Sequence, residues 1–114
     1  MRHLLGPQVL VRVYTGENAQ WHHRPLVTAL VERLRKEGFA GVTVFRGIEG
    51  YGAHHVIHTT HILELSSDLP LVIEIVETEE ALTRLLPILD EMVLKGLVTM
   101  SKVEVLKYAP GPGA

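Results

Sequence analysis

Residues 71–76 read Leu-Val-Ile-Glu-Ile-Val, and this short run is the clearest strand in the sequence. Valine and isoleucine favour extended backbone because their branched side chains pack well on a pleated sheet. Side chains alternate along a strand, so the odd-numbered residues share one face and the even-numbered residues, Glu74 among them, share the other. Since both faces are largely apolar, the run predicts a core strand of a sheet that is covered on both sides.

Three further strands are expected around this run, at residues 8–14, 41–46 and 97–108. The first two are rich in β-branched residues and end at glycine or other turn-forming residues, and the third is centred on Val103 and Val105. The four strands are separated by two segments whose apolar residues recur at helical spacing.

Two helices are therefore expected. The first covers residues 24–37 and ends at Gly38, which supplies a left-handed cap. The second covers residues 78–96, and Thr78 can cap its first turn. Pro87 lies inside the second helix, and because proline lacks a backbone N–H we expect either a kink or a late start of that helix.

The order of elements is β-α-β-β-α-β, with a long connection between the second and third strands. This order predicts an α+β, ferredoxin-like fold, in which one antiparallel sheet carries both helices on the same face. The strand side chains expected beneath the helices are apolar: Val9, Val11, Val13, Leu71, Ile73, Ile75, Val103 and Val105. The second helix is expected to face them with an apolar stripe of Leu82, Leu85, Leu86, Leu89, Met92 and Val93.

The face of the sheet away from the helices is expected to carry Leu10, Phe45, Val72, Val76 and Leu106, together with Arg12, Glu74 and Glu104. This mixture is more apolar than a solvated sheet face usually is. We therefore expect a homo-oligomer that buries sheet against sheet, in which Arg12 pairs with Glu74 or Glu104. A monomer with an apolar surface is the alternative.

The chain of 114 residues corresponds to one domain. Its net charge of −2 gives no general attraction to nucleic acid or to anionic lipid, and neither is expected as a partner. The sequence has no cysteine, so a metal would need histidine or carboxylate ligands, and a reducing, cytoplasmic location is expected. The apolar stretch at residues 4–11 is too short to cross a membrane, so no membrane insertion is expected.

Residues 47–61 follow the second strand and begin with three glycines in six residues. Glycine accepts positive φ and has no side chain to pack, so this segment is expected to be a long loop that is mobile or shaped by a bound group. A short extended piece at residues 62–65 leads back toward the sheet. The folded domain is expected to span residues 1–108, and residues 109–114 form a disordered tail rich in proline and glycine.

Three stretches carry a resemblance to a known superfamily. They are Tyr14-x-Gly16-Glu17, then Gly41-x-Thr43-Val44-x-Arg46-Gly47-Ile48-Glu49-Gly50-Tyr51-Gly52, and Leu69-Pro70-Leu71-Val72-Ile73-Glu74-Ile75-Val76. The chain resembles the nitrogen-regulatory PII superfamily, and most closely the PII-like branch known as a domain of unknown function. The resemblance covers residues 8–108, and Arg-Gly-Ile-Glu-Gly-Tyr-Gly is fairly specific to that branch.

The resemblance implies a homotrimer of ferredoxin-like subunits with a cleft between neighbours. PII proteins bind adenine nucleotides in these clefts, and their loop after the second strand, here residues 47–61, switches conformation to regulate a partner such as a membrane transporter. Residues 95–102 lack the Gly-Asp-Gly-Lys phosphate loop of PII proteins. Triphosphate binding in the PII manner therefore does not follow, and a monophosphate nucleotide, another small ligand or no nucleotide stay open.

Six residues are candidates for contact with such an effector: Glu17, Arg46, Gly47, Gly50, Gly52 and His58. An arginine can make a bidentate contact with phosphate, and glycines let backbone amides approach an anion or an adenine edge. Glu17 would hold the ligand or the loop from the neighbouring turn. A purely mechanical hinge is the alternative for the glycines, whose spacing does not lead into a helix as a dinucleotide-binding fingerprint does.

Four histidines lie in the same loop, at His54, His55, His58 and His61. Imidazoles can coordinate zinc, copper or nickel, but at this spacing only a helix would gather three of them on one face, and a helix is not expected there. A divalent-metal-binding trimer that brings together copies of one histidine is the alternative function, similar in architecture to copper-tolerance trimers. Exposed histidines that contact a partner, or that switch the loop with pH, are the other interpretations.

An enzyme is not expected, because the chain has no cysteine nucleophile and Ser66 and Ser67 lack the context of an activated serine. Trp21 precedes the first helix and is either part of the core or an exposed contact for a partner. His22 and His23 beside it are expected at the surface.

Overall fold

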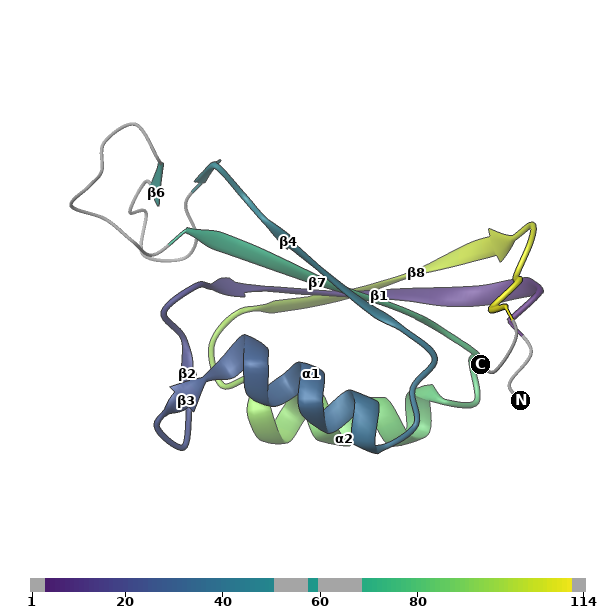
Figure 1. Cartoon of the computed structure of the whole chain (residues 1–114), viewed down its shortest axis with the longest axis horizontal. Coiled ribbons are helices and arrows are strands. Elements are labelled where there is room, and N and C mark those ends of the chain that lie inside the picture. Colours follow the sequence, from purple (N-terminus) through teal and green to yellow (C-terminus); the bar gives the residue numbers. More distant parts are fainter. Residues whose placement is uncertain (1–3, 51–57, 60–68, 112–114) are drawn as a thin grey trace.

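The computed structural model describes residues 4–50, 58–59 and 69–111 (Figure 1). Four strands form the main sheet: β1 (Gly6–Gly16), β4 (Val42–Arg46), β7 (Pro70–Glu77) and β8 (Leu97–Val105). The helices are α1 (Leu26–Lys36) and α2 (Leu82–Met92). Two short antiparallel strand pairs are also described: β2 (Gln20–Trp21) with β3 (Arg24–Pro25), and β5 (Glu49–Gly50) with β6 (His58–Thr59).

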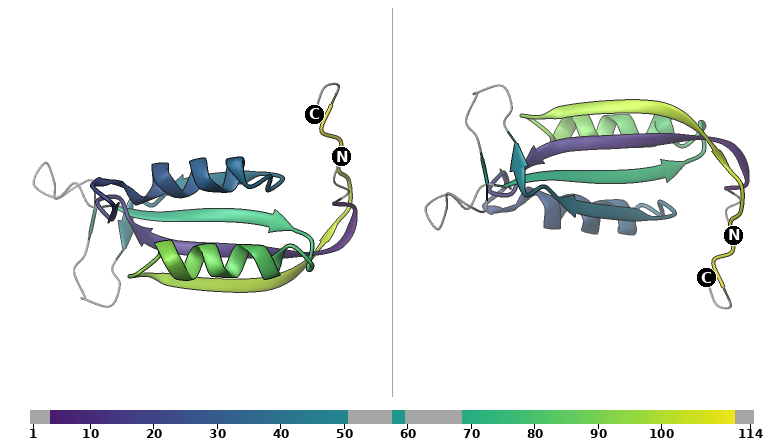
Figure 2. Two further views of the ribbon diagram at one scale, coloured as in Figure 1. Left: turned by 90° about the horizontal axis from the view of Figure 1, so that it is seen from below. Right: turned by 90° about the horizontal axis from the view of Figure 1, so that it is seen from above.

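The main sheet is antiparallel throughout and has the strand order β4-β7-β1-β8. Both helices lie on one face of this sheet, and the right-hand view of Figure 2 shows the other face with no helix over it. The expected α+β, ferredoxin-like arrangement with two helices on one face is therefore confirmed. We call the uncovered side, which carries the even-numbered residues Leu10 to Tyr14 of β1, the open face.

The core lies between the helices and the sheet. Alternate residues of β1 and β7 point into it, and Val11, Val13, Ile73 and Ile75 are fully buried. The helices contribute Leu26, Ala29, Leu30, Leu34, Leu85, Ile88, Leu89 and Met92. Burying each large side chain contributes about 1.5–3 kcal/mol, so this layer is the main source of stability for the fold.

Helix α1 is shorter than the predicted 24–37 at both ends, because Arg24 and Pro25 belong to β3 and the last helical residue is Lys36. Gly38 has a φ of 85°, as expected for a left-handed cap. The backbone N–H of Phe39 then donates to the carbonyl of Leu34 at 3.1 Å, which turns the chain back toward the core.

Helix α2 starts later than Thr78, whose Oγ1 accepts a hydrogen bond from the N–H of Ala81 at 3.2 Å in the turn before the helix. A late start is one of the two outcomes expected from Pro87, which stays inside the helix. The predicted apolar stripe is wrong at Leu86, which is 47% exposed, whereas Ile88 is buried. The buried stripe of α2 consists of Leu85, Ile88, Leu89 and Met92. Successive residues are about 100° apart around a helix, so Leu86 points away from this stripe.

The prediction for the last strand is wrong in its orientation. Gln8 pairs with Val103, and residues opposite each other in an antiparallel pair point to the same face. Val103 and Val105 therefore lie on the open face and not beneath the helices with Val9. A shift of one residue exchanges the two faces of a strand, and both sides of β8 carry apolar residues, so the pattern alone did not decide the register.

The same register corrects two other residues. Glu104 is opposite Pro7 and so lies on the helix side of the sheet, where it cannot pair with Arg12 on the open face. Leu106 lies beyond the end of β8 and is 86% exposed. Phe45, opposite Val72 on the open face, is where the alternation predicted it.

The open face combines an ion pair with apolar side chains. Arg12 is opposite Glu74, and its Nε donates to Oε2 of Glu74 at 2.8 Å. This hydrogen bond raises the pKa of Arg12, because the carboxylate stabilises the charged guanidinium. The neighbours of the pair on this face include Leu10, Tyr14, Val72 and Val76, all only partly buried, and Phe45, which is 50% exposed.

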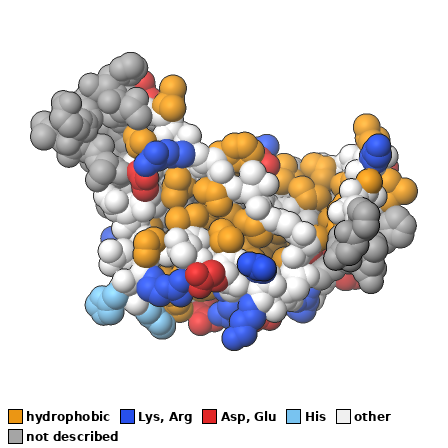
Figure 3. Space-filling model, viewed as in Figure 1, with side chains coloured by type: hydrophobic (Ala, Val, Ile, Leu, Met, Phe, Trp, Pro, Cys, Tyr) orange, Lys and Arg blue, Asp and Glu red, His pale blue; other side chains and the backbone are white. Residues whose placement is uncertain are grey.

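Charged and apolar side chains are also separated when the molecule is viewed from the β4 side. In Figure 3, lysine, arginine and acidic side chains gather along the lower edge, over α1, while hydrophobic side chains fill the middle of the view. Within the described ranges, no helix has the length and hydropathy needed to cross a membrane.

Candidate functional site

The sheet brings Glu17 and Arg46 to the same end of the molecule. Arg46, the last residue of β4, is opposite Leu71, and Gly16, the last residue of β1, is opposite Pro70. Both strands run antiparallel to β7, so their C-terminal ends flank the first residues of β7. Two side chains that are 29 residues apart in sequence therefore meet across one strand.

Arg46 and Glu17 form an ion pair in which Nη2 of the arginine donates to Oε2 of the glutamate. The arginine side chain is 60% exposed and the glutamate side chain 27% exposed. A guanidinium group has five N–H donors in a planar fork, a geometry that matches carboxylate and phosphate groups. The end of β4 thus presents an exposed cation. Its partner is a carboxylate, which is an anionic acceptor as a phosphate would be.

Backbone hydrogen bonds hold both partners of this pair in place. The N–H of Glu17 donates to the carbonyl of Leu69 at 2.8 Å, and the N–H of Gly47 donates to the carbonyl of Pro70 at 2.7 Å. The backbone of Glu17 and the backbone next to Arg46 are therefore fixed to successive carbonyls at the start of β7. We call Glu17, Arg46, Gly47, Leu69 and Pro70 the strand-end site.

Two of the predicted glycines pack against the same proline. A Cβ atom at Gly47 would lie 2.7 Å from Cγ of Pro70, and one at Gly50 would lie 3.4 Å from it. The first distance is shorter than real Cβ contacts allow, so a larger residue at position 47 would force the chain away from β7. Close approach of the backbone is one physical reason for glycine at Gly47.

His58 lies opposite Gly50 in the β5–β6 pairing, which brings the backbones of these two candidate residues together. The segment expected to be a loop is therefore extended at two points. Gly52 lies outside the described residues, as do Tyr51 and the expected extended piece at residues 62–65. Five of the six candidate effector residues are thus described, and Glu17 and Arg46 are in direct contact.

The metal prediction is not tested by these observations. His54, His55 and His61 lie outside the described residues. Among the residues that the structure describes, no group of three or more histidine or acidic side chains is placed to hold a metal ion.

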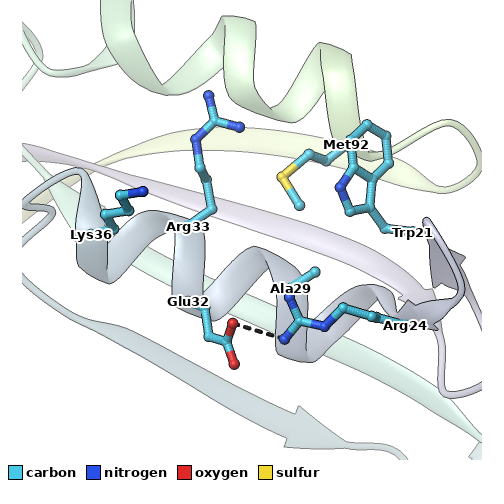
Figure 4. A pocket seen from close by; sticks show the side chains of 7 residues that line it. All are labelled: Trp21, Arg24, Ala29, Glu32, Arg33, Lys36 and Met92. Atoms are coloured by element: carbon cyan, nitrogen blue, oxygen red, sulfur yellow. Dashed lines mark hydrogen bonds and ion pairs between the residues drawn. The ribbon is translucent and has the colours of Figure 1, made fainter.

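A second surface feature was not expected from the sequence. A shallow groove of about 230 Å³ lies between the β2–β3 hairpin and the two helices, lined by Trp21, Arg24, Ala29, Glu32, Arg33, Lys36 and Met92 (Figure 4). Trp21 is partly buried against the core and also lines the groove, and its indole stacks on the ring of His22 with centroids 4.0 Å apart.

Most of the charge in the groove is already neutralised. Arg24 pairs with Glu32 at 2.8 Å, as the dashed line in Figure 4 shows. Arg33 pairs with Glu37 at 2.9 Å and lies 3.6 Å from Glu91. The cations of the groove are therefore paired, as Arg46 is, but the residues that line the groove include no glycine, whereas closely packed glycine backbone lies beside Arg46. This backbone makes the strand-end site the stronger candidate for an anionic ligand.

Comparison with known proteins identifies the family of the chain. The sequence pattern of the DUF190 family, described as an uncharacterized ACR, matches residues 8–105. The chain belongs to the DUF190 family. It is 38% identical over 99 residues to a UPF0166 protein of Aquifex aeolicus (85% of this chain, 91% of the relative). It is 33% identical over 99 residues to a UPF0166 protein of Methanocaldococcus jannaschii (86% and 91%).

Solved structures share the fold of this DUF190 chain at low sequence identity. CPII from Thiomonas intermedia, bound to ADP and bicarbonate, has a TM-score of 0.64 at 19% identity and covers 89% of this chain and 90% of its own. A PII-like signaling protein of Thermus thermophilus has a TM-score of 0.61 at 21% identity (89% and 91%). The Bacillus subtilis GlnK–ATP complex has a TM-score of 0.58 at 14% identity (89% and 85%). These matches confirm that the chain shares the fold of PII-like proteins, as the resemblance implied.

Proposed function

We propose that this DUF190 chain is a PII-like regulatory protein that binds an adenine nucleotide at a cleft between subunits. The observation that carries the proposal is the strand-end site, where β1, β4 and β7 converge and Arg46 presents an exposed guanidinium beside closely packed glycine backbone. Support also comes from CPII, which has the same fold and is bound to ADP and AMP in its solved structures.

The open face supports an assembly of identical subunits. Its partly buried Leu10, Val72 and Val76 surround the Arg12–Glu74 ion pair, and an internal pair needs no charged partner from a second subunit. An apolar sheet face gains free energy when it is removed from water, at about 25 cal/mol for each Å². We propose a homotrimer in which three open faces meet, so that the strand ends of neighbouring subunits border each cleft.

The regulatory output is proposed to pass through residues 47–61, which continue directly from Arg46 and Gly47. An effector that binds one state of this segment more tightly shifts its population by no more than that difference in affinity. A partner protein that recognises only one state would then respond to the effector. The superfamily resemblance points to a membrane transporter as such a partner. No role in catalysis is proposed.

Isothermal titration calorimetry with AMP, ADP and ATP tests the nucleotide proposal. We expect binding of at least one of them to the wild-type protein, and a loss of at least tenfold in affinity in R46Q. R24Q is the matched control, because Arg24 is also an exposed arginine in an ion pair with glutamate but lies in the groove between the helices. Absence of binding for all three nucleotides would overturn the proposal.

The alternative, a metal-binding trimer, is tested in the same instrument. Titration with Zn²⁺ and Cu²⁺ in place of nucleotide would give tight binding that is lost in H58A. Such a result, together with no heat from any nucleotide, would favour the metal function over the nucleotide function.

A further inference from the structure

The ion pair between Glu17 and Arg46 has a consequence for any anion that Arg46 binds. The carboxylate occupies Nη2 of the guanidinium, one of the donors that a phosphate group would use. An incoming phosphate must therefore share the arginine with Glu17 or displace it. We propose, on the basis of the nucleotide function, that Glu17 competes with the phosphate of the effector for Arg46. Binding of the effector then replaces the Glu17–Arg46 pair with an Arg46–phosphate pair.

The exposure of the two side chains favours such an exchange. Arg46 is 60% exposed and Glu17 is 27% exposed, so the pair is largely solvated. Solvated ion pairs of this kind are weak, whereas the contact of arginine with phosphate is bidentate and involves more than one negative charge. The carboxylate can therefore hold the guanidinium when no ligand is present without preventing a phosphate from taking its place.

The backbone at both residues stays anchored when the side chains separate. The N–H of Glu17 is bonded to Leu69 and the N–H of Gly47 is bonded to Pro70, and neither bond involves the carboxylate or the guanidinium. Exchange of partners therefore requires only rotation of two side chains about their own bonds. The strand-end site thus has two arrangements on the same main chain: in one Arg46 is paired with Glu17, and in the other it is paired with an anion.

Two consequences follow for the ligand class. A nucleoside without phosphate cannot compete with the carboxylate, so its affinity does not depend on Glu17. A nucleotide meets the competitor, so its affinity rises when the carboxylate is removed. The strand-end site therefore selects for a negatively charged group. The contact of that group with Arg46 must be stronger than the Glu17–Arg46 ion pair that it replaces.

The test compares E17Q with E32Q. Both variants remove one negative charge from an exposed arginine–glutamate pair, but Glu32 pairs with Arg24 in the groove between the helices. We expect E17Q to bind AMP and ADP about two- to fivefold more tightly than the wild type, which corresponds to removal of a surface ion pair. We expect E32Q to match the wild type, and adenosine to bind E17Q and the wild type equally.

The outcomes separate this inference from the function on which it rests. Binding of AMP or ADP that is equal in E17Q, E32Q and the wild type would overturn the competitor and leave the nucleotide function intact. No binding of either nucleotide to the wild type or to E17Q would overturn both. Circular dichroism and thermal unfolding of E17Q verify that the variant is folded, and E17D, which retains the charge on a shorter side chain, should show a smaller increase in affinity than E17Q.

Discussion

The carboxylate of Glu77, at the end of β7, accepts a hydrogen bond from the backbone N–H of Ala40 with an N–O distance of 2.9 Å. Its other oxygen accepts from the N–H of Thr78, also at 2.9 Å, and the residue is 0% exposed. A buried carboxylate is tolerated only when its acceptors are satisfied. Glu77 thus ties the chain that follows α1 to the beginning of the connection into α2.

Substitution of this residue by glutamine is expected to destabilise the fold. The amide keeps one acceptor but turns an NH₂ group toward a backbone N–H that needs an acceptor, so one hydrogen bond is lost and a buried donor is left unpaired. We expect E77Q to lower the free energy of unfolding by about 2–3 kcal/mol in urea titrations followed by circular dichroism. E79Q, at an exposed acidic residue nearby, is the control and should stay within about 0.5 kcal/mol of the wild type.

The close contact of Gly47 with Pro70 leads to a second prediction. A methyl group at position 47 would lie 2.7 Å from Cγ of the proline ring, which has little freedom to move. We expect G47A to cost about 1–3 kcal/mol of stability, the range for overpacking. The measurement is again equilibrium unfolding in urea.

Gly41 provides the control for this substitution. A Cβ there would meet nothing within 4 Å, so G41A should leave stability unchanged or raise it by about 0.4–1 kcal/mol through the unfolded chain. Equal stability of G47A and G41A would show that the chain after β4 moves away from Pro70 at no cost, and would contradict the role assigned to Gly47.

The sequence could predict the layers of this fold because alternation and helical spacing are read within each element. Val11, Val13, Ile73 and Ile75 are buried as their alternation required. The register of β8 was not readable, because it depends on its pairing with β1 and not on its own composition.

In the candidate site too, single residues could be predicted from the sequence but their contacts could not. Arg46 and Glu17 were each identified as candidates, but their direct contact depends on the antiparallel placement of β1 and β4 on either side of β7. Glu77 was missed because glutamate at the end of a strand is usually exposed, and its burial follows from backbone donors that no side-chain pattern reveals.

The β2–β3 hairpin was also missed, and its turn gives the third prediction. His22 and His23 have φ values of 48° and 66°, in the left-handed region that two-residue hairpin turns require and that asparagine and glycine normally occupy. Glycine at position 23 removes a left-handed cost of about 1–2 kcal/mol and loses about 0.5–1 kcal/mol through its greater freedom when unfolded. We expect H23G to raise stability by about 0.75 kcal/mol, the difference between the midpoints of these two ranges.

His22 distinguishes backbone strain from side-chain contact in this turn. Its ring stacks on Trp21 at an interplanar angle of 15°, so H22G relieves the backbone but loses the stacking. We expect little or no gain from H22G in the same unfolding experiment. A gain from H22G that equals that of H23G would mean that the stacked rings contribute nothing to stability.

The open face gives the last prediction, which concerns assembly. Val76 is opposite Leu10 on this face, beside the Arg12–Glu74 pair, and a glutamate at position 76 would place a second carboxylate near Glu74, at the centre of the proposed contact between subunits. We expect the wild-type protein to sediment as a trimer of the 12.7 kDa chain at micromolar concentration, and V76E to sediment as a folded monomer. L86E introduces the same charge at an exposed position on α2, on the opposite side of the sheet, and should stay trimeric. A wild-type protein that sediments as a monomer would remove the proposed clefts, since each subunit alone contributes only one side of them.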